Sequence, residues 1–90
     1  YMIQLAVRFR QNEDVPKFVD IVQKLPYHAD LTSAKRVVDA KSLLGVFALS
    51  KASRLKLSIY ANYTDIDPSH LNCLAEFSGK KSESDRQEIA

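Results

Sequence analysis

The sequence predicts an α+β fold in which a sheet of four strands carries three helices on one face. Ninety residues allow one domain with a single modest core. The composition, 46% hydrophobic and 27% charged, is that of a globular chain and excludes collagen-like and wholly disordered classes. Strand-like and helix-like segments follow one another in the order strand, helix, strand, strand, helix, strand, helix. This order favours a layer of helices packed on a sheet.

The first strand and the first helix are indicated by changes in hydrophobic spacing. Residues 3–9 alternate between apolar and polar positions, which is typical of a half-buried strand. Apolar residues then recur at steps of three and four over residues 15–25, which predicts an amphipathic helix. We expect Asn12 or Asp14 to cap the start of this helix and Pro26 to end it.

The middle of the chain predicts a hairpin and a short helix. Residues 30–33 and 36–40 are two extended pieces joined by a turn at 34–35, where neither residue favours positive φ. The hairpin therefore needs a turn type other than the usual two-residue ones. Ser42 is a favoured N-cap, so residues 42–50 are expected to form a helix of two turns.

The last strand and the last helix show the clearest start signals. Residues 55–61 alternate as a half-buried strand does. Asp67 is expected to cap the final helix, and Pro68 suits its first position because a missing N–H costs nothing there. The residues expected to face the core from this helix are Leu71, Leu74, Ala75 and Phe77 or Ser78.

The domain is expected to span residues 2–78. Gly79 is expected to end the last helix, and residues 79–90 form a polar helix extension or a loose tail. No stretch of about 18 apolar residues occurs, so we expect no membrane insertion. We also expect the protein to be cytoplasmic and monomeric.

Low counts of cysteine and histidine limit the chemistry. One cysteine excludes an intramolecular disulfide and a multi-thiolate zinc site, and two histidines argue against a histidine-rich metal site. No metal and no cofactor are therefore predicted. Cys73 is interpreted as a packing residue of the last helix.

Positive charge is concentrated in the middle of the chain. The whole chain has a formal net charge of +2, but residues 35–56 carry six basic side chains and one acidic one, a net charge of +5. Such an island either is a solvated surface or attracts acidic proteins or phosphate groups. The basic residues are Lys35, Arg36, Lys41, Lys51, Arg54 and Lys56.

The segment Asp39–Leu49 resembles the regulatory-serine segment of the HPr family, the small phosphocarriers of the bacterial sugar phosphotransferase system. It is equally similar to Crh, an HPr relative that lacks the phosphocarrier histidine. The order of elements over residues 2–78 also matches that family. The resemblance implies an open-faced β-sandwich, in which a four-stranded antiparallel sheet is covered on one side by three helices.

The chain departs from the family where the phosphoacceptor histidine is expected. HPr proteins have a Gly-aliphatic-His-Ala-Arg-Pro stretch there, and only Pro16 matches it. The remaining positions are Gln11, Asn12, Glu13, Asp14 and Val15. None of these side chains does the nucleophilic work of a histidine near neutral pH. The sequence therefore predicts a regulatory, protein-binding module that is neither a carrier nor an enzyme, and the carboxylates are expected to cap the helix rather than to mimic phosphate.

Ser42 is the candidate regulatory residue. It matches the serine that a dedicated kinase phosphorylates in some family members, and the alternative is that Ser42 only caps its helix. Val46 and Leu49 are expected to face the sheet, which leaves an apolar patch exposed for docking. The predicted docking residues are Lys41, Leu43, Leu44, Phe47 and Lys51.

The resemblance also implies the class of partner. Phosphotransferase-system enzymes, an HPr-type kinase or a transcriptional regulator are the expected protein partners. One alternative is a phosphocarrier that uses a non-standard acceptor; Arg8 and Arg10 flank that site and either contact an anion or are solvated. Another is nucleic-acid binding through the basic island, against which Tyr60 and Tyr63 lie outside the island and leave no stacking platform.

Overall fold

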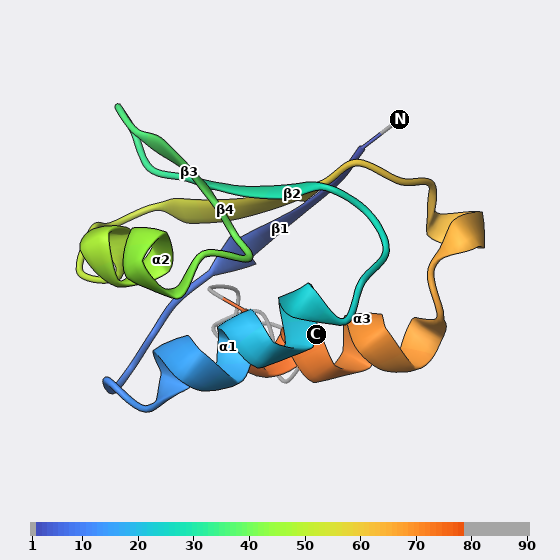
Figure 1. The fold of residues 1–90 in the computed structure, drawn as a ribbon, viewed down its shortest axis with the longest axis horizontal. Coiled ribbons are helices and arrows are strands. Elements are labelled where there is room, and N and C mark those ends of the chain that lie inside the picture. The colour runs from blue at the N-terminus through green and yellow to red at the C-terminus, as the bar shows by residue number, and fades with distance from the viewer. Residues whose placement is uncertain (1, 79–90) are drawn as a thin grey trace, which may run out of the picture.

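The structure is a computed structural model that describes residues 2–78 (Figure 1). The strands are β1 (Ile3–Val7), β2 (Ala29–Thr32), β3 (Val37–Asp39) and β4 (Leu55–Ile59). The helices are α1 (Asp14–Gln23), α2 (Leu43–Leu49) and α3 (Pro68–Leu74), with short 3₁₀ segments η1 (Tyr63–Asp65) and η2 (Ala75–Phe77).

The four strands form one antiparallel sheet in the order β1-β4-β2-β3. In the central pairs, Leu57 of β4 lies opposite Leu5 of β1 and Leu31 of β2. Figure 1 shows α1, α2 and α3 on the same side of this sheet. The predicted α+β fold with helices on one face is confirmed.

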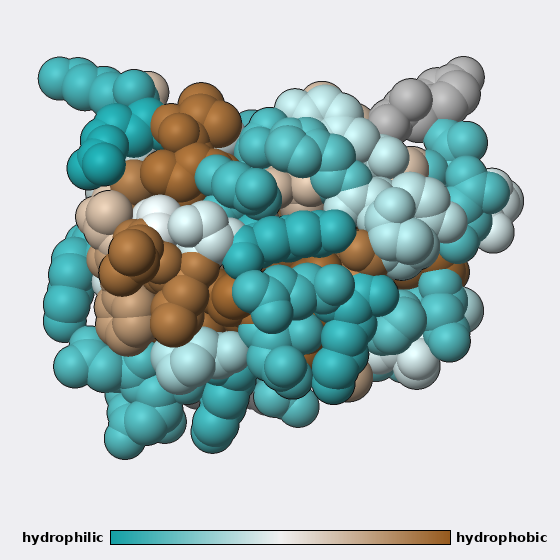
Figure 2. All heavy atoms as spheres, in the orientation of Figure 1, coloured by the Kyte–Doolittle hydropathy of each residue, from teal (hydrophilic) through white to brown (hydrophobic). Residues whose placement is uncertain are grey.

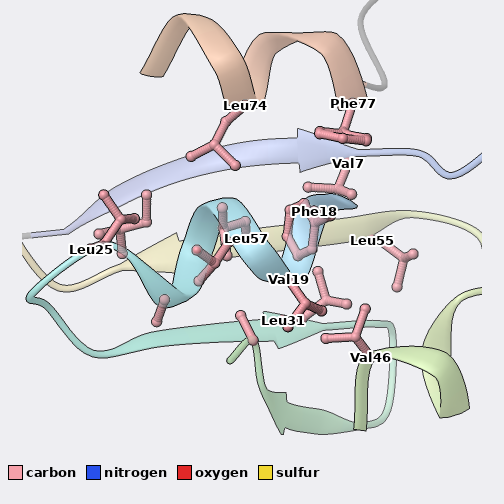
Figure 3. Close-up of a cluster of buried hydrophobic side chains, with 14 of the residues drawn as sticks. Val7, Phe18, Val19, Leu25, Leu31, Val46, Leu55, Leu57, Leu74 and Phe77 are labelled. Atoms are coloured by element: carbon pink, nitrogen blue, oxygen red, sulfur yellow. The ribbon is translucent and has the colours of Figure 1, made fainter. Parts of the chain in front are cut away.

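The core lies between the sheet and the helices. Leu57 and Leu31 are fully buried beneath Phe18 of α1, as the alternation of the strands predicts. Figure 3 shows side chains from α1, β2 and α2 converging in the same space. Phe18 also contacts Phe9 and Phe77 edge-on, with ring centroids 5.2 and 5.7 Å apart. Each such pair adds about 0.5–1.5 kcal/mol beyond the burial of its area.

The first strand and the first helix are shorter than the spacing predicts. Strand β1 pairs only as far as Val7, where its partner strand begins, and the next N–H, that of Arg8, donates to the Phe77 carbonyl at 2.7 Å. Helix α1 ends at Gln23, although Leu25 is still buried. The chain tightens into a turn there because helical geometry is disfavoured immediately before Pro26.

The hairpin keeps its register with an unusual turn. Thr32 pairs with Val37, and the Ser33 N–H donates to the Arg36 carbonyl at 2.9 Å. Arg54 is the non-glycine residue with positive φ among residues 2–78, so the hairpin turn stays in ordinary backbone regions. The expectation of a different turn type is confirmed.

The last helix begins as predicted and ends differently. Asp67 caps it by accepting the Ser69 N–H at 2.9 Å. This bond lowers the pKa of the Asp67 carboxyl. After Leu74 the chain tightens into η2, which keeps Leu74 and Phe77 aligned because residues three apart eclipse in a 3₁₀-helix.

Cys73 and Ala75 were predicted to pack in the core, and both predictions are wrong. The two residues are exposed, because they flank the buried Leu74 on either side of the helix. The predicted helix end at Gly79 and the predicted tail 79–90 lie outside the described residues. Within residues 2–78, no helix has the length and the apolar character that crossing a bilayer requires.

Candidate functional site

Hydrogen bonds within the chain occupy several of the backbone donors at the start of α1. The Asp14 carboxylate turns back to the preceding loop, where one oxygen, Oδ2, accepts the N–H groups of Arg10 at 2.9 Å and Gln11 at 3.3 Å. The Asp14 N–H itself donates to the Gln11 carbonyl at 3.0 Å. The Val15 N–H likewise donates to the Asn12 carbonyl at 3.2 Å.

These hydrogen bonds reduce the number of N–H groups at the start of α1 that could bind phosphate. A helix N-terminus binds phosphate through N–H groups that have no partner inside the helix. Here two of those groups are occupied, Pro16 has none, and Glu13 and Asp14 add negative charge. The predicted cap by Asn12 or Asp14 is wrong, because Glu13 is the N-cap and no side chain caps the helix.

The two histidines lie elsewhere in the fold. His28 precedes β2, beyond the opposite end of α1, and its Nε2 lies 2.9 Å from Asp30 Oδ1. The Tyr60 hydroxyl donates to the other carboxylate oxygen at 3.1 Å, and this bond raises the pKa of Tyr60. His70 lies in the first turn of α3. Within residues 2–78, no group of three histidine, cysteine or acidic side chains is placed to hold a metal ion.

Helix α2 presents two different faces. Val46 and Leu49 are buried against the sheet, as the spacing predicts. Leu43, Leu44 and Phe47 form what we call the α2 apolar surface, with exposed fractions of 42%, 81% and 41%. Figure 2 shows hydrophobic atoms gathered over α2 and over neighbouring β3, with hydrophilic atoms around them.

Ser42 is the N-cap of α2, as predicted. Its Oγ accepts the N–H of Gly45 at 3.1 Å, and the residue is exposed. Gly45 lies at the close approach of α2 to β3: a Cβ added there would lie 3.2 Å from Val38 Cβ and 3.3 Å from Ser42 Oγ, so these neighbours would have to shift by a few tenths of an ångström. The glycine therefore allows close packing of α2 against β3.

The two lysines predicted beside this surface differ in their surroundings. Lys51 is exposed just beyond the end of α2. Lys41 is half-buried, and its Nζ donates to the Leu25 carbonyl at 2.6 Å. The Gln23 amide in turn donates to the Lys41 carbonyl at 2.9 Å. Lys41 thus joins the end of α1 to the start of α2, a role that the sequence pattern does not reveal.

The fold also assembles a set of cations that the sequence separates. The residues after β1 and the loop between α2 and β4 border a hollow of about 650 Å³. We call this the basic hollow, and its charged lining residues are Arg8, Arg10, Lys51 and Arg54. Only Lys51 and Arg54 belong to the predicted basic island. Arg8 and Arg10 lie far from them in the sequence, so the sequence does not show that the four residues form one set.

Comparison with known proteins identifies the architecture. No protein-family model matches the chain, and no curated protein matches it. A crystal structure of the phosphocarrier protein HPr from Bacillus anthracis str. Ames matches with a TM-score of 0.62 and 17% identity, over 87% of this chain and 95% of that one. A crystal structure of HPr-C-His from Thermoanaerobacter tengcongensis matches with a TM-score of 0.61 and 16% identity, over 84% and 88%. The chain therefore has the fold of the HPr phosphocarrier proteins.

Proposed function

We propose that this chain is an HPr-like module that binds other proteins through α2 and has a regulatory rather than a phosphocarrier or enzymatic role. The observation that carries the proposal is the α2 apolar surface. Leu44 is 81% exposed on a helix whose opposite face is fully buried. Contiguous apolar side chains with a charged rim mark protein-binding surfaces, because their burial by a partner is favourable.

The start of α1 supports the non-carrier half of the proposal. A carrier needs a nucleophile and a place for the transferred phosphoryl group. At residues 11–14 there is no histidine, and Asp14 occupies the N–H groups of the loop. A phosphoryl group brought there would meet two carboxylates and few free donors.

Ser42 is the proposed switch. It is exposed, and it stands directly before Leu43 and Leu44. A phosphate on this hydroxyl would add about −1.5 to −2 charges beside the apolar surface. A partner that buries Leu43 and Leu44 would also contact Ser42. Phosphorylation of Ser42 would therefore change the affinity of the chain for that partner. Phosphotransferase-system enzymes, an HPr-type kinase and a transcriptional regulator remain the proposed partners, in the cytoplasm.

The proposal is tested by affinity capture from a lysate of the source organism, followed by calorimetry with each purified partner. We expect Leu44→Ser to lose the partner, because it removes the most exposed apolar side chain of the surface without adding charge. The matched control is Tyr63→Ser, which removes an exposed aromatic side chain, 62% exposed, from η1 and outside the α2 apolar surface. Ser42→Asp is expected to shift the affinity for the same partner.

Two results would contradict the proposal. One is equal affinity of the parent chain and Leu44→Ser for every captured protein. The other is loss of binding in Tyr63→Ser to the same degree as in Leu44→Ser, which would place the contact elsewhere.

A further inference from the structure

The basic hollow carries positive charge that the described residues do not neutralise. Arg8 and Arg10 follow β1, and Lys51 and Arg54 lie in the loop between α2 and β4. All four residues are exposed, and no aspartate or glutamate lines the hollow. The ion pairs among residues 2–78 are Lys24 with Asp20 and His28 with Asp30, so none involves these four cations.

A second hollow adjoins the first and adds to its positive charge. It has a volume of about 400 Å³ and shares Ala6, Arg54 and Leu55 with the basic hollow. It adds one further cation, Lys56, and it too is lined without an acidic residue. Five cations therefore line the two adjoining hollows, and their summed positive potential attracts polyanions from solution.

We infer that the basic hollow receives a carboxylate-rich segment of the same partner protein that docks on α2. This inference rests on the proposed function and deepens it by giving the partner a charge. Lys51 is two residues past the end of α2, and Phe47 lies one turn before it. A partner that covers Phe47 therefore reaches Lys51 and, through it, the hollow.

An acidic protein segment fits this region better than a nucleic acid. Base stacking on exposed aromatic rings supplies much of the affinity for single strands. Phe9 is the aromatic residue that lines the hollow, and its ring is occupied by edge-on contact with Phe18 at 5.2 Å and by Phe77 at 6.3 Å. Tyr60 lies outside the lining of both hollows and is bonded to Asp30.

The test is a titration of the full chain with short poly-L-glutamate, in which binding is monitored by the chemical shifts of the backbone amides. We expect shifts to concentrate at residues 6–10 and 50–56 and to weaken as salt is added. Arg8→Gln combined with Lys51→Gln is expected to weaken binding about tenfold, because it removes two of the four cations that line the basic hollow. The control, Lys17→Gln with Lys35→Gln, makes the same change in net charge outside the hollow and is expected to retain the affinity of the parent chain.

Three results would overturn the inference. They are an equal loss of affinity in the control pair, the absence of shifts at residues 6–10 and 50–56, and tighter binding of an oligouridylate through those same amides. Leu44→Ser separates this inference from the proposed function, because that variant is expected to bind poly-L-glutamate normally while losing the captured partner. If the double variant Arg8→Gln with Lys51→Gln binds poly-L-glutamate as the parent does, and Leu44→Ser still loses the partner, this inference is wrong and the proposed function stands.

Discussion

Ser42 caps α2 and is also the proposed regulatory residue. Its Oγ accepts the Gly45 N–H and leaves the hydroxyl exposed. Ser42→Ala removes the cap and is expected to lower the free energy of unfolding by about 1 kcal/mol. Ser42→Asn, which keeps a side-chain acceptor, should stay close to the parent in urea denaturation. A loss in Ser42→Asn as large as in Ser42→Ala would show that the cap is not the stabilising feature.

Arg54 is held in a backbone conformation that disfavours its side chain. Its φ of 61° lies in the left-handed region, which costs a residue with a Cβ about 1–2 kcal/mol. Part of this cost is offset because glycine loses more chain entropy on folding. Arg54→Gly should therefore raise the free energy of unfolding by about 0.5–1 kcal/mol. The neighbouring Ser53→Gly, at ordinary φ, is expected to lower it, and stabilisation by both substitutions would contradict this explanation.

The Asp30 carboxylate controls the titration of Tyr60. The hydrogen bond between them raises the pKa of the Tyr60 hydroxyl above its usual value of about 10. The stabilisation from this bond is present in full below the unfolded pKa and is lost as pH rises through the folded pKa. In a carbon-13 titration of the tyrosine rings, Asp30→Asn should bring the Tyr60 pKa back towards the usual value. An unchanged midpoint in Asp30→Asn would exclude the carboxylate as the cause.

At the scale of elements, α2 shows what hydrophobic spacing can predict. Serine before a short apolar run predicts the cap, and the step from Val46 to Leu49 predicts the buried face. Both depend on residues within one or two turns of each other. The close contact of Gly45 with Val38 depends instead on how α2 approaches β3, and spacing carries no information on that.

Gly45→Ala tests this close packing between elements. In an open helix the substitution would stabilise by about 1 kcal/mol. Here the new Cβ would lie 3.2 Å from Val38 Cβ, which is fixed to the backbone, so α2 and β3 would have to separate by a few tenths of an ångström to admit it. We expect a lower free energy of unfolding than in the parent. Ala48→Gly on the exposed side of α2 reports the propensity alone, and a gain of about 1 kcal/mol in Gly45→Ala would contradict close packing.

Other features of the site depend on contacts between distant segments. The sequence places carboxylates at the start of α1 but does not reveal that Asp14 turns back to the loop N–H groups. Nor does it reveal that Lys41 bonds to the Leu25 carbonyl. The basic hollow joins residues 8–10 with residues 51–54, which only the pairing of β1 with β4 brings together.

For the whole molecule, the order of elements predicts the fold class but not the order of strands. Strand β4 lies between β1 and β2, although it is the last strand in the chain. Such pairing is set by long-range packing of the apolar faces rather than by local spacing. The resemblance of Asp39–Leu49 to the HPr family supplied the antiparallel sheet in advance, and the structural comparison supports it.

We propose that this chain, although it has the HPr fold, does not carry phosphate at the start of α1. The direct measurement is incubation of the full chain with phosphoenolpyruvate and the general enzyme of the phosphotransferase system, followed by intact mass and peptide mapping. A functional HPr serves as the positive control. We predict no acid-labile phosphate on this chain while the control is phosphorylated. Acid-labile phosphate on Glu13 or Asp14 would contradict this claim, and such phosphate on His28 or His70 would show that the chain is a carrier through another residue.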